Sequence, residues 1–155
     1  MKQLFVVAAC SAALLSGCAS GNKEAGQNPF LSEYNTPFQV PPFDEIKMEH
    51  YKPAFLQGME EQAKEIEAIV NNEEPATFEN TIVALDQSGQ LLSKVSIVFS
   101  GLNSANTNDE MQALSRELSP LLSKHSDDIN LNPKLFARVK EVYEKRESLG
   151  LDKEQ

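Results

Sequence analysis

Apolar residues recur every three or four positions over most of this chain, which is the spacing of amphipathic helices. Four such patterns follow one another, over about residues 49–71, 77–102, 107–129 and 132–150. The apolar stripe of the first pattern is Tyr51, Phe55, Met59, Ala63, Ile66 and Val70. In the last it is Leu135, Phe136, Val139, Val142 and Tyr143. We therefore predict an all-α body of about four helices.

Local signals set the expected ends of these helices. Thr77 is a suitable N-cap for the second, and Thr107 with Glu110 three residues later has the spacing of a capping box for the third. The fourth begins with the pair Asn132–Pro133, a cap followed by the proline that the first helical position tolerates. Gly150 suits its end.

Three helix-disfavouring residues lie inside the patterns. Pro53 falls in the first turns of its helix, where a missing N–H is tolerated. Pro120 should kink the third helix. Gly89 interrupts the second and costs about 1 kcal/mol relative to Ala unless close packing needs the space.

A proline-rich segment precedes the helices, at residues 29–43. It interleaves four prolines with apolar side chains, namely Phe30, Leu31, Tyr34, Phe38, Val40 and Phe43. The prolines exclude a long helix and a central strand. We expect an extended arm whose aromatic side chains fill grooves on the helical body. A ligand for a proline-binding domain is the weaker alternative, because only the loose pair Pro37 and Pro41 suits it.

The first 17 residues have the layout of an export signal. One lysine precedes an apolar run of about a dozen residues, which is shorter than the roughly 20 that span a bilayer. The run ends in Leu15-Ser16-Gly17-Cys18, which resembles a bacterial lipobox. We predict a lipoprotein signal peptide over 1–17, lipidation of Cys18 and a flexible polar tether over 18–28. An ordinary secretory signal that contains a Cys by chance is the alternative.

Lipidation would place the protein in the bacterial cell envelope. Multiple acyl chains give stable membrane anchoring. Ala19 follows the lipidated position, and by analogy with lipoprotein sorting the absence of an aspartate there favours the outer membrane. Cys10 would leave with the signal, so no thiol would remain for a disulfide or a nucleophile.

Charge excludes one class of partner. The 155 residues carry 23 acidic and 14 basic side chains, a formal charge of −9. A non-specific nucleic-acid binder needs clustered Lys and Arg, so we predict no nucleic-acid partner. The hydrophobic fraction of 41 % is too high for a disordered chain.

No catalytic or metal-binding motif is found. A zinc helix of the His-Glu-x-x-His type needs two histidines on one face, but His50 and His125 are 75 positions apart and neither starts that motif. We expect His125 to be a hydrogen-bonded core or groove residue and His50 a surface or capping residue. The pair Asp127–Asp128 and the glutamates of 60–67 are expected to be solvated helix faces. We therefore predict no catalytic residue and no metal ligand in the chain, and lipidation of Cys18 as its one modified site.

Several motifs in order resemble a known family. They include Asn28-Pro29-Phe30-Leu31, His50-Tyr51-Lys52-Pro53-Ala54-Phe55, Pro75-Ala76-Thr77-Phe78-Glu79-Asn80-Thr81 and Leu131-Asn132-Pro133-Lys134-Leu135-Phe136. Over about residues 28–152 the chain resembles the amino-terminal region of bacterial peptidyl-dipeptidases (dipeptidyl carboxypeptidases). These belong to the thimet-oligopeptidase-like zinc metallopeptidases.

The resemblance implies a lipid-anchored parent enzyme that removes carboxyl-terminal dipeptides from short peptides. In that family a helical shell encloses a channel, and one zinc ion is held by a His-Glu-x-x-His helix and a later Glu. None of those ligands is present here. The chain would then supply an anchor through Cys18, and channel wall through residues 29–155, to an enzyme whose sequence continues past Gln155. The alternative is a stand-alone helical lipoprotein that acts as an adaptor or peptide-binding module.

Overall fold

The computed structural model describes residues 28–152, which form helices and turns and contain no strand. The predicted signal peptide, Cys18 and nearly all of the tether lie outside these residues. The elements, in chain order, are η1 (Pro29–Leu31), η2 (Pro37–Gln39), α1 (Met48–Val70), η3 (Phe78–Val83), α2 (Ala84–Asp86), α3 (Gln90–Ala105), α4 (Asp109–Asn130), α5 (Pro133–Lys145) and η4 (Arg146–Ser148). The four predicted helical regions and the all-α class are confirmed. None of the helices described is long and apolar enough to cross a bilayer.

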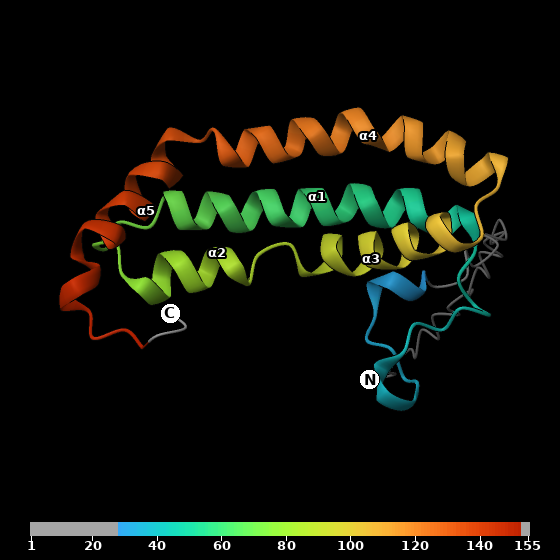
Figure 1. The fold of residues 1–155 in the computed structure, drawn as a ribbon, viewed down its shortest axis with the longest axis horizontal. Helices are drawn as coiled ribbons and strands as arrows, with labels where there is room; N and C mark the ends of the chain where they lie inside the picture. Colours follow the sequence, from blue (N-terminus) through green and yellow to red (C-terminus); the bar gives the residue numbers. More distant parts are fainter. Residues whose placement is uncertain (1–27, 153–155) are drawn as a thin grey trace, which may run out of the picture.

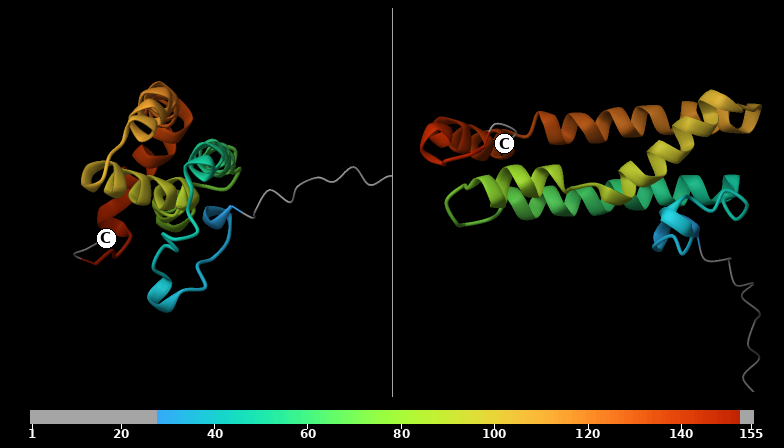
Figure 2. Two further views of the ribbon diagram at one scale, coloured as in Figure 1. Left: turned by 90° about the vertical axis from the view of Figure 1, so that its right-hand side faces the viewer. Right: turned by 60° about the horizontal axis from the view of Figure 1, so that its bottom comes forward.

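The long helix α1 organises the body (Figure 1). It lies between α4 on one side and the α2–α3 segment on the other, and it contacts α3, α4 and α5. The arm crosses one end of α1 and α3, and α5 packs near the other end of α1 (Figure 2).

The main core is built around aromatic rings. Tyr51 and Phe55 of α1 both contact Phe99 of α3 edge-on, with ring centroids 5.1 and 5.6 Å apart. Phe30 of the arm packs on Tyr51 at 5.2 Å. Such tilted and edge-on contacts are favourable arrangements for aromatic pairs. A smaller cluster of Ile66, Ile69 and Leu135 joins the far end of α1 to α5.

The buried face of α1 differs from the predicted stripe. Ala63 is exposed and Met59 is half-buried, so these two predictions were wrong. The buried residues are Tyr51, Ala54, Phe55, Gly58, Ile66 and Ile69. The buried face shifts because α3 approaches α1 at a residue without a side chain, Gly58. A Cβ on Gly58 would lie 2.8 Å from the backbone of Leu92.

The second helical region is broken in the middle. Thr77 caps it as predicted, accepting from Asn80 N, and a π-helical turn follows. At Gly89 the chain takes φ +73° and a new helix, α3, begins. A side chain there would be strained and would also meet the Gln62 amide, 2.5 Å from its Cβ.

The cap predicted for α4 was wrong by one position. Asn108, not Thr107, caps the helix, accepting from Met111 N at 2.8 Å, while Thr107 Oγ1 donates to Asn103 Oδ1. Asparagine is among the best N-cap residues, because its side-chain oxygen can accept the backbone N–H three positions later. The helix continues through Pro120 without a break.

The predictions for α5 were mixed. Asn132 caps the helix, accepting from the N–H groups of Lys134 and Leu135. However, Phe136 and Tyr143 of the predicted stripe are 66 % and 62 % exposed. They lie beyond the part of the stripe that meets α1 and η3. Gly150, with φ +63°, follows the last helical turn.

The arm is only half docked. Phe30 is 1 % exposed, whereas Phe38 is 99 % exposed, with φ +59° in a short 3₁₀ turn. The expectation that the arm's aromatic residues fill grooves is therefore confirmed for Phe30 and wrong for Phe38 and Phe43. Asn28 was assigned to the tether, but it caps the first turn and donates to His50 O at 2.8 Å, so this residue is part of the folded body.

Candidate functional site

His50 closes the start of α1. Its Nδ1 accepts the backbone N–H of Lys47 at 3.0 Å, and its own N–H donates to Lys47 O. These reciprocal bonds satisfy groups that a helix end leaves free. The predicted capping role is confirmed.

His125 links three helical segments. Its Nε2 donates to Gln62 Oε1 of α1 at 2.8 Å, and Gln62 Nε2 donates to Ser88 Oγ, beside the break before α3, at 3.3 Å. Burial lowers the pKa of His125 below its usual 6.5, and Lys124 adds to this while Asp128 opposes it. The hydrogen-bonded groove position expected for His125 is confirmed.

The described residues do not fit a zinc site. Within residues 28–152, no three His, Cys, Asp or Glu side chains lie close enough together to hold a metal ion. His125 contacts Gln62, which is twelve residues beyond His50 in α1, or about 18 Å along the helix at 1.5 Å per residue. The two histidines therefore cannot share one ion.

The acidic positions lie at the surface, as expected. Asp127 and Asp128 are both exposed, and Asp128 pairs with Lys124 one turn earlier. On α1, Glu60 pairs with Lys64, and this bond lowers the pKa of the Glu60 carboxyl. Glu65 also accepts the Gly89 N–H at 2.7 Å, which fixes the start of α3.

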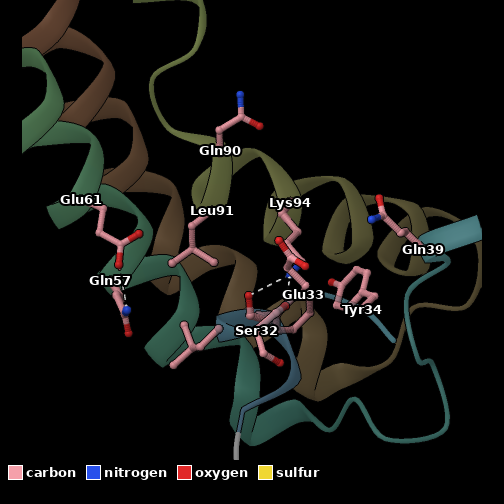
Figure 3. A pocket seen from close by; sticks show the side chains of 11 residues that line it. Ser32, Glu33, Tyr34, Gln39, Gln57, Glu61, Gln90, Leu91 and Lys94 are labelled. Atoms are coloured by element: carbon pink, nitrogen blue, oxygen red, sulfur yellow. Dashed lines mark hydrogen bonds between the residues drawn. The ribbon is translucent and has the colours of Figure 1, made fainter. Parts of the chain in front are cut away.

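An open cleft of about 680 Å³ lies where the arm crosses α1 and α3 (Figure 3). Lys94 of α3 lies along one side. Its Nζ donates to the carbonyls of Phe30 and Ser32, at 3.1 and 2.6 Å, and lies 3.8 Å from the centroid of the Tyr34 ring. Burial lowers the pKa of Lys94, opposed by Glu33. Lys94 therefore fastens the arm to α3.

The chemistry of this cleft suits the binding of a peptide. Besides Ser32, Tyr34 and Lys94, its polar lining includes carboxylates and amides, with Glu33 and Gln39 on the arm, Gln57 and Glu61 on α1 and Gln90 on α3. Such groups can hydrogen-bond a peptide backbone.

Comparison with known proteins identifies relatives of this chain. No family model matches it. Over 127 residues, 82 % of its length, it is 49 % identical to the dipeptidyl carboxypeptidase of Escherichia coli K12 and 50 % identical to that of Salmonella typhimurium. This chain is a relative of the dipeptidyl carboxypeptidases. The resemblance inferred from the motifs is confirmed.

The dipeptidyl carboxypeptidases are much longer than this chain. It spans 19 % of the length of either enzyme. A more distant similarity connects it to oligopeptidase A of Escherichia coli, with 29 % identity over 115 residues, 74 % of this chain and 16 % of that protein.

The motif that most clearly marks the dipeptidyl carboxypeptidase resemblance, residues 75–81, is held together by one amide. Asn80 Oδ1 accepts from Thr77 N, Thr81 Oγ1 and Arg138 Nη2, at 2.9, 2.9 and 3.1 Å. Its Nδ2 donates to Pro75 O at 3.0 Å. The motif is therefore a structural junction between η3 and α5.

The sequence did not reveal the partners in these networks. Gln62, Lys94 and Arg138 each bond across more than 20 positions, and no periodic pattern signals such pairs. Arg138 also donates to the carbonyls of Asn72 and Glu74, at 2.8 and 3.2 Å.

Proposed function

We propose that this chain is the helical amino-terminal part of a lipid-anchored zinc metallopeptidase. The parent would be a peptidyl-dipeptidase that releases carboxyl-terminal dipeptides from short peptides. The observation that carries this proposal is the identity of 49–50 % to two dipeptidyl carboxypeptidases over 82 % of the chain. Zinc dependence comes from the family that the motifs resemble.

The role proposed for this segment is structural. Its helices would form part of the wall around a peptide channel, and Cys18 would anchor the enzyme to a membrane of the bacterial envelope, the outer membrane in particular. What supports a wall role is that the described residues form a body of packed helices around α1.

The decisive experiment follows the gene past codon 155 and assays its complete product. We expect an open reading frame that continues and encodes a His-Glu-x-x-His motif. We also expect a purified protein with one zinc per chain that shortens an amino-terminally blocked peptide by two residues. A stop after codon 155, with a stable folded product, would overturn the proposal in favour of a stand-alone peptide-binding lipoprotein. The 680 Å³ cleft would then be the first place to look for a bound peptide.

The segment alone gives a second measurement. Purified residues 28–155 should bind no stoichiometric zinc and cleave no peptide, because His50 and His125 are engaged separately. One tightly bound zinc per chain, found by elemental analysis, would contradict the assignment of the zinc site to another part of the parent.

A further inference from the structure

The outer face of α3 carries no charge. Seven of its residues are exposed and none of them is ionisable. They include Ser93, Ile97, Ser100 and Gly101, and Ile97 is 68 % exposed. Lys94, the only ionisable residue of α3, is occupied by the two arm carbonyls. A helix without charge on its solvent side is typical of a buried helix.

The neighbouring helices show that this is specific to α3. The exposed sides of α1 and α4 carry ion pairs, such as Lys64 with Glu60 on α1 and Lys124 with Asp128 on α4. Lys52 of α1 also pairs with Glu117 of α4. These two helices are ordinary amphipathic surface helices, and α3 differs from them.

An uncharged groove runs beside this face, between α3 and α4. It has a volume of about 320 Å³, and none of its lining residues is ionisable. Its floor is formed by Phe55, Phe99, Leu118 and Leu122, of which the first three are buried. The end-on view shows α1, α3 and α4 grouped around a common core (Figure 2). The groove is lined by residues of α3 and α4, with Phe55 of α1 as the contribution from the third helix.

Both walls of the groove are lined by small side chains. Serines recur at four-residue spacing, with Ser96 and Ser100 on α3 and Ser115, Ser119 and Ser123 on α4. Rows at this spacing are the ridges and grooves by which helices interlock, at axis separations of about 8–10 Å. The Ser100 hydroxyl donates to Ile97 O at 3.2 Å, so it needs no external partner.

Gly101 also suits the close approach of another helix to α3. A Cβ there would meet no atom within 4 Å, so nothing in the described residues requires a glycine. Glycine inside a helix costs about 1 kcal/mol relative to Ala. Close approach of another helix would explain why the chain accepts this cost.

We propose that the groove and the outer face of α3, here called the helix seat, bind an uncharged α-helix from the remainder of the parent polypeptide. This inference rests on the proposed function. The occupant is a helix of the same polypeptide because the relatives are about four times as long as this chain. Substrate peptides vary in charge and would gain no ion pair on this surface, whereas an apolar helix face needs none.

The test measures burial at the seat in the complete polypeptide that the gene encodes, with the signal removed and Cys18→Ser. Ser100→Cys places a thiol of nearly the same size in the seat. Lys64→Cys, on the charged face of α1, is the matched control. Each maleimide labelling rate is compared with the rate in urea, and mass spectrometry of peptides locates the label. We expect folding to slow the labelling of Ser100→Cys at least about 100-fold, and the labelling of Lys64→Cys less than about 10-fold.

Charge insertion gives a second readout. Ser100→Asp should lower the melting temperature of the complete polypeptide by several degrees, because its charge would be buried. Lys64→Glu should lower it less, because it disrupts only an exposed ion pair with Glu60. An unchanged melting temperature with Ser100→Asp would contradict an occupied seat.

The labelling outcomes separate the seat from the proposed function. Equal labelling of Ser100→Cys and Lys64→Cys overturns the seat, even in an active peptidase. Protection that appears only when a short peptide is added also overturns it, since the surface would then be channel wall. If the gene ends at codon 155, the proposed function fails. Protection that then depended on protein concentration would identify a second copy as the occupant and overturn our choice of partner.

Discussion

At the scale of single residues, Asn80 connects more of the structure than any sequence pattern suggests. Its side chain bonds to two backbone groups and two side chains, and one of these, Arg138, lies 58 positions away. Asn80→Ala would leave these partners unsatisfied. We expect a loss of about 2–3 kcal/mol in the free energy of unfolding, measured by urea denaturation.

Asn130→Ala is the matched control, because Asn130 is exposed and its side chain donates only to Ser126 Oγ. Its effect should stay within about 0.5 kcal/mol. Equal effects of the two substitutions would show that the Asn80 network adds nothing to stability.

His125 should make stability depend on pH. Burial lowers its pKa in the folded state, so the unfolded chain binds a proton first as the pH falls. The stabilisation is therefore complete above the unfolded pKa, near 6.5, and is lost as the pH falls through the lower folded pKa. Urea midpoints between pH 8 and 5 should fall more steeply for the native chain than for His125→Gln. Parallel curves would show that His125 protonates alike in both states.

At the scale of elements, the arm offers two phenylalanines in opposite environments. Phe30 is buried on Tyr51, and Phe38 is almost fully exposed. Phe30→Ala should therefore cost about 3 kcal/mol or more of stability, and Phe38→Ala less than about 0.5 kcal/mol. A comparable loss for both substitutions, measured by urea denaturation, would mean that the arm docks along its whole length.

Two helical glycines make a second matched pair. At Gly58 a methyl group would lie 2.8 Å from the Leu92 backbone, whereas at Gly101 it would meet nothing. In residues 28–155, we expect Gly58→Ala to destabilise by about 1–3 kcal/mol and Gly101→Ala to stabilise by about 0.5–1 kcal/mol. A neutral Gly58→Ala in chemical denaturation would contradict the close α1–α3 approach.

The elements themselves were predictable because their signals are local. Helical spacing and caps such as Thr77 and Asn132 act within a few residues, and both caps are in place. The errors came where distant contacts decide. Phe38 and Phe136 occupy positions where the pattern predicts burial, yet both are exposed, because burial depends on which distant residues pack against a side chain. At Gly89 a side chain would meet the Gln62 amide, 27 positions earlier, which no local pattern indicates.

The candidate site was less predictable than the fold. The environments expected for His50 and His125 are confirmed, because helix position alone indicates a cap or a stripe. The cleft beside the arm could not be foreseen. It exists because Lys94 fastens the arm across α3, and the partners in that contact are backbone carbonyls, which every residue carries.

At the scale of the whole molecule, the uncovered apolar surface and the similarity to longer peptidases support the same interpretation. Phe136 and Tyr143 on α5 and Ile97 on α3 are all more than 60 % exposed. Exposed apolar patches mark interaction surfaces in soluble proteins. A body of this kind is expected to be covered in its parent, as the helix seat proposes for α3.

Membrane attachment of the whole protein rests on one thiol. If Cys18 carries the lipid, Cys18→Ala should move the exported protein from the membrane fraction to the soluble fraction and abolish incorporation of labelled fatty acid, because stable anchoring needs the acyl chains. Cys10→Ala is the control, since Cys10 lies within the predicted signal and would be removed with it. Its membrane fraction should equal that of the native protein. Membrane association that survives Cys18→Ala, or that is lost with Cys10→Ala, would contradict lipidation at Cys18. A native protein found in the soluble fraction without labelled fatty acid would favour the ordinary secretory signal.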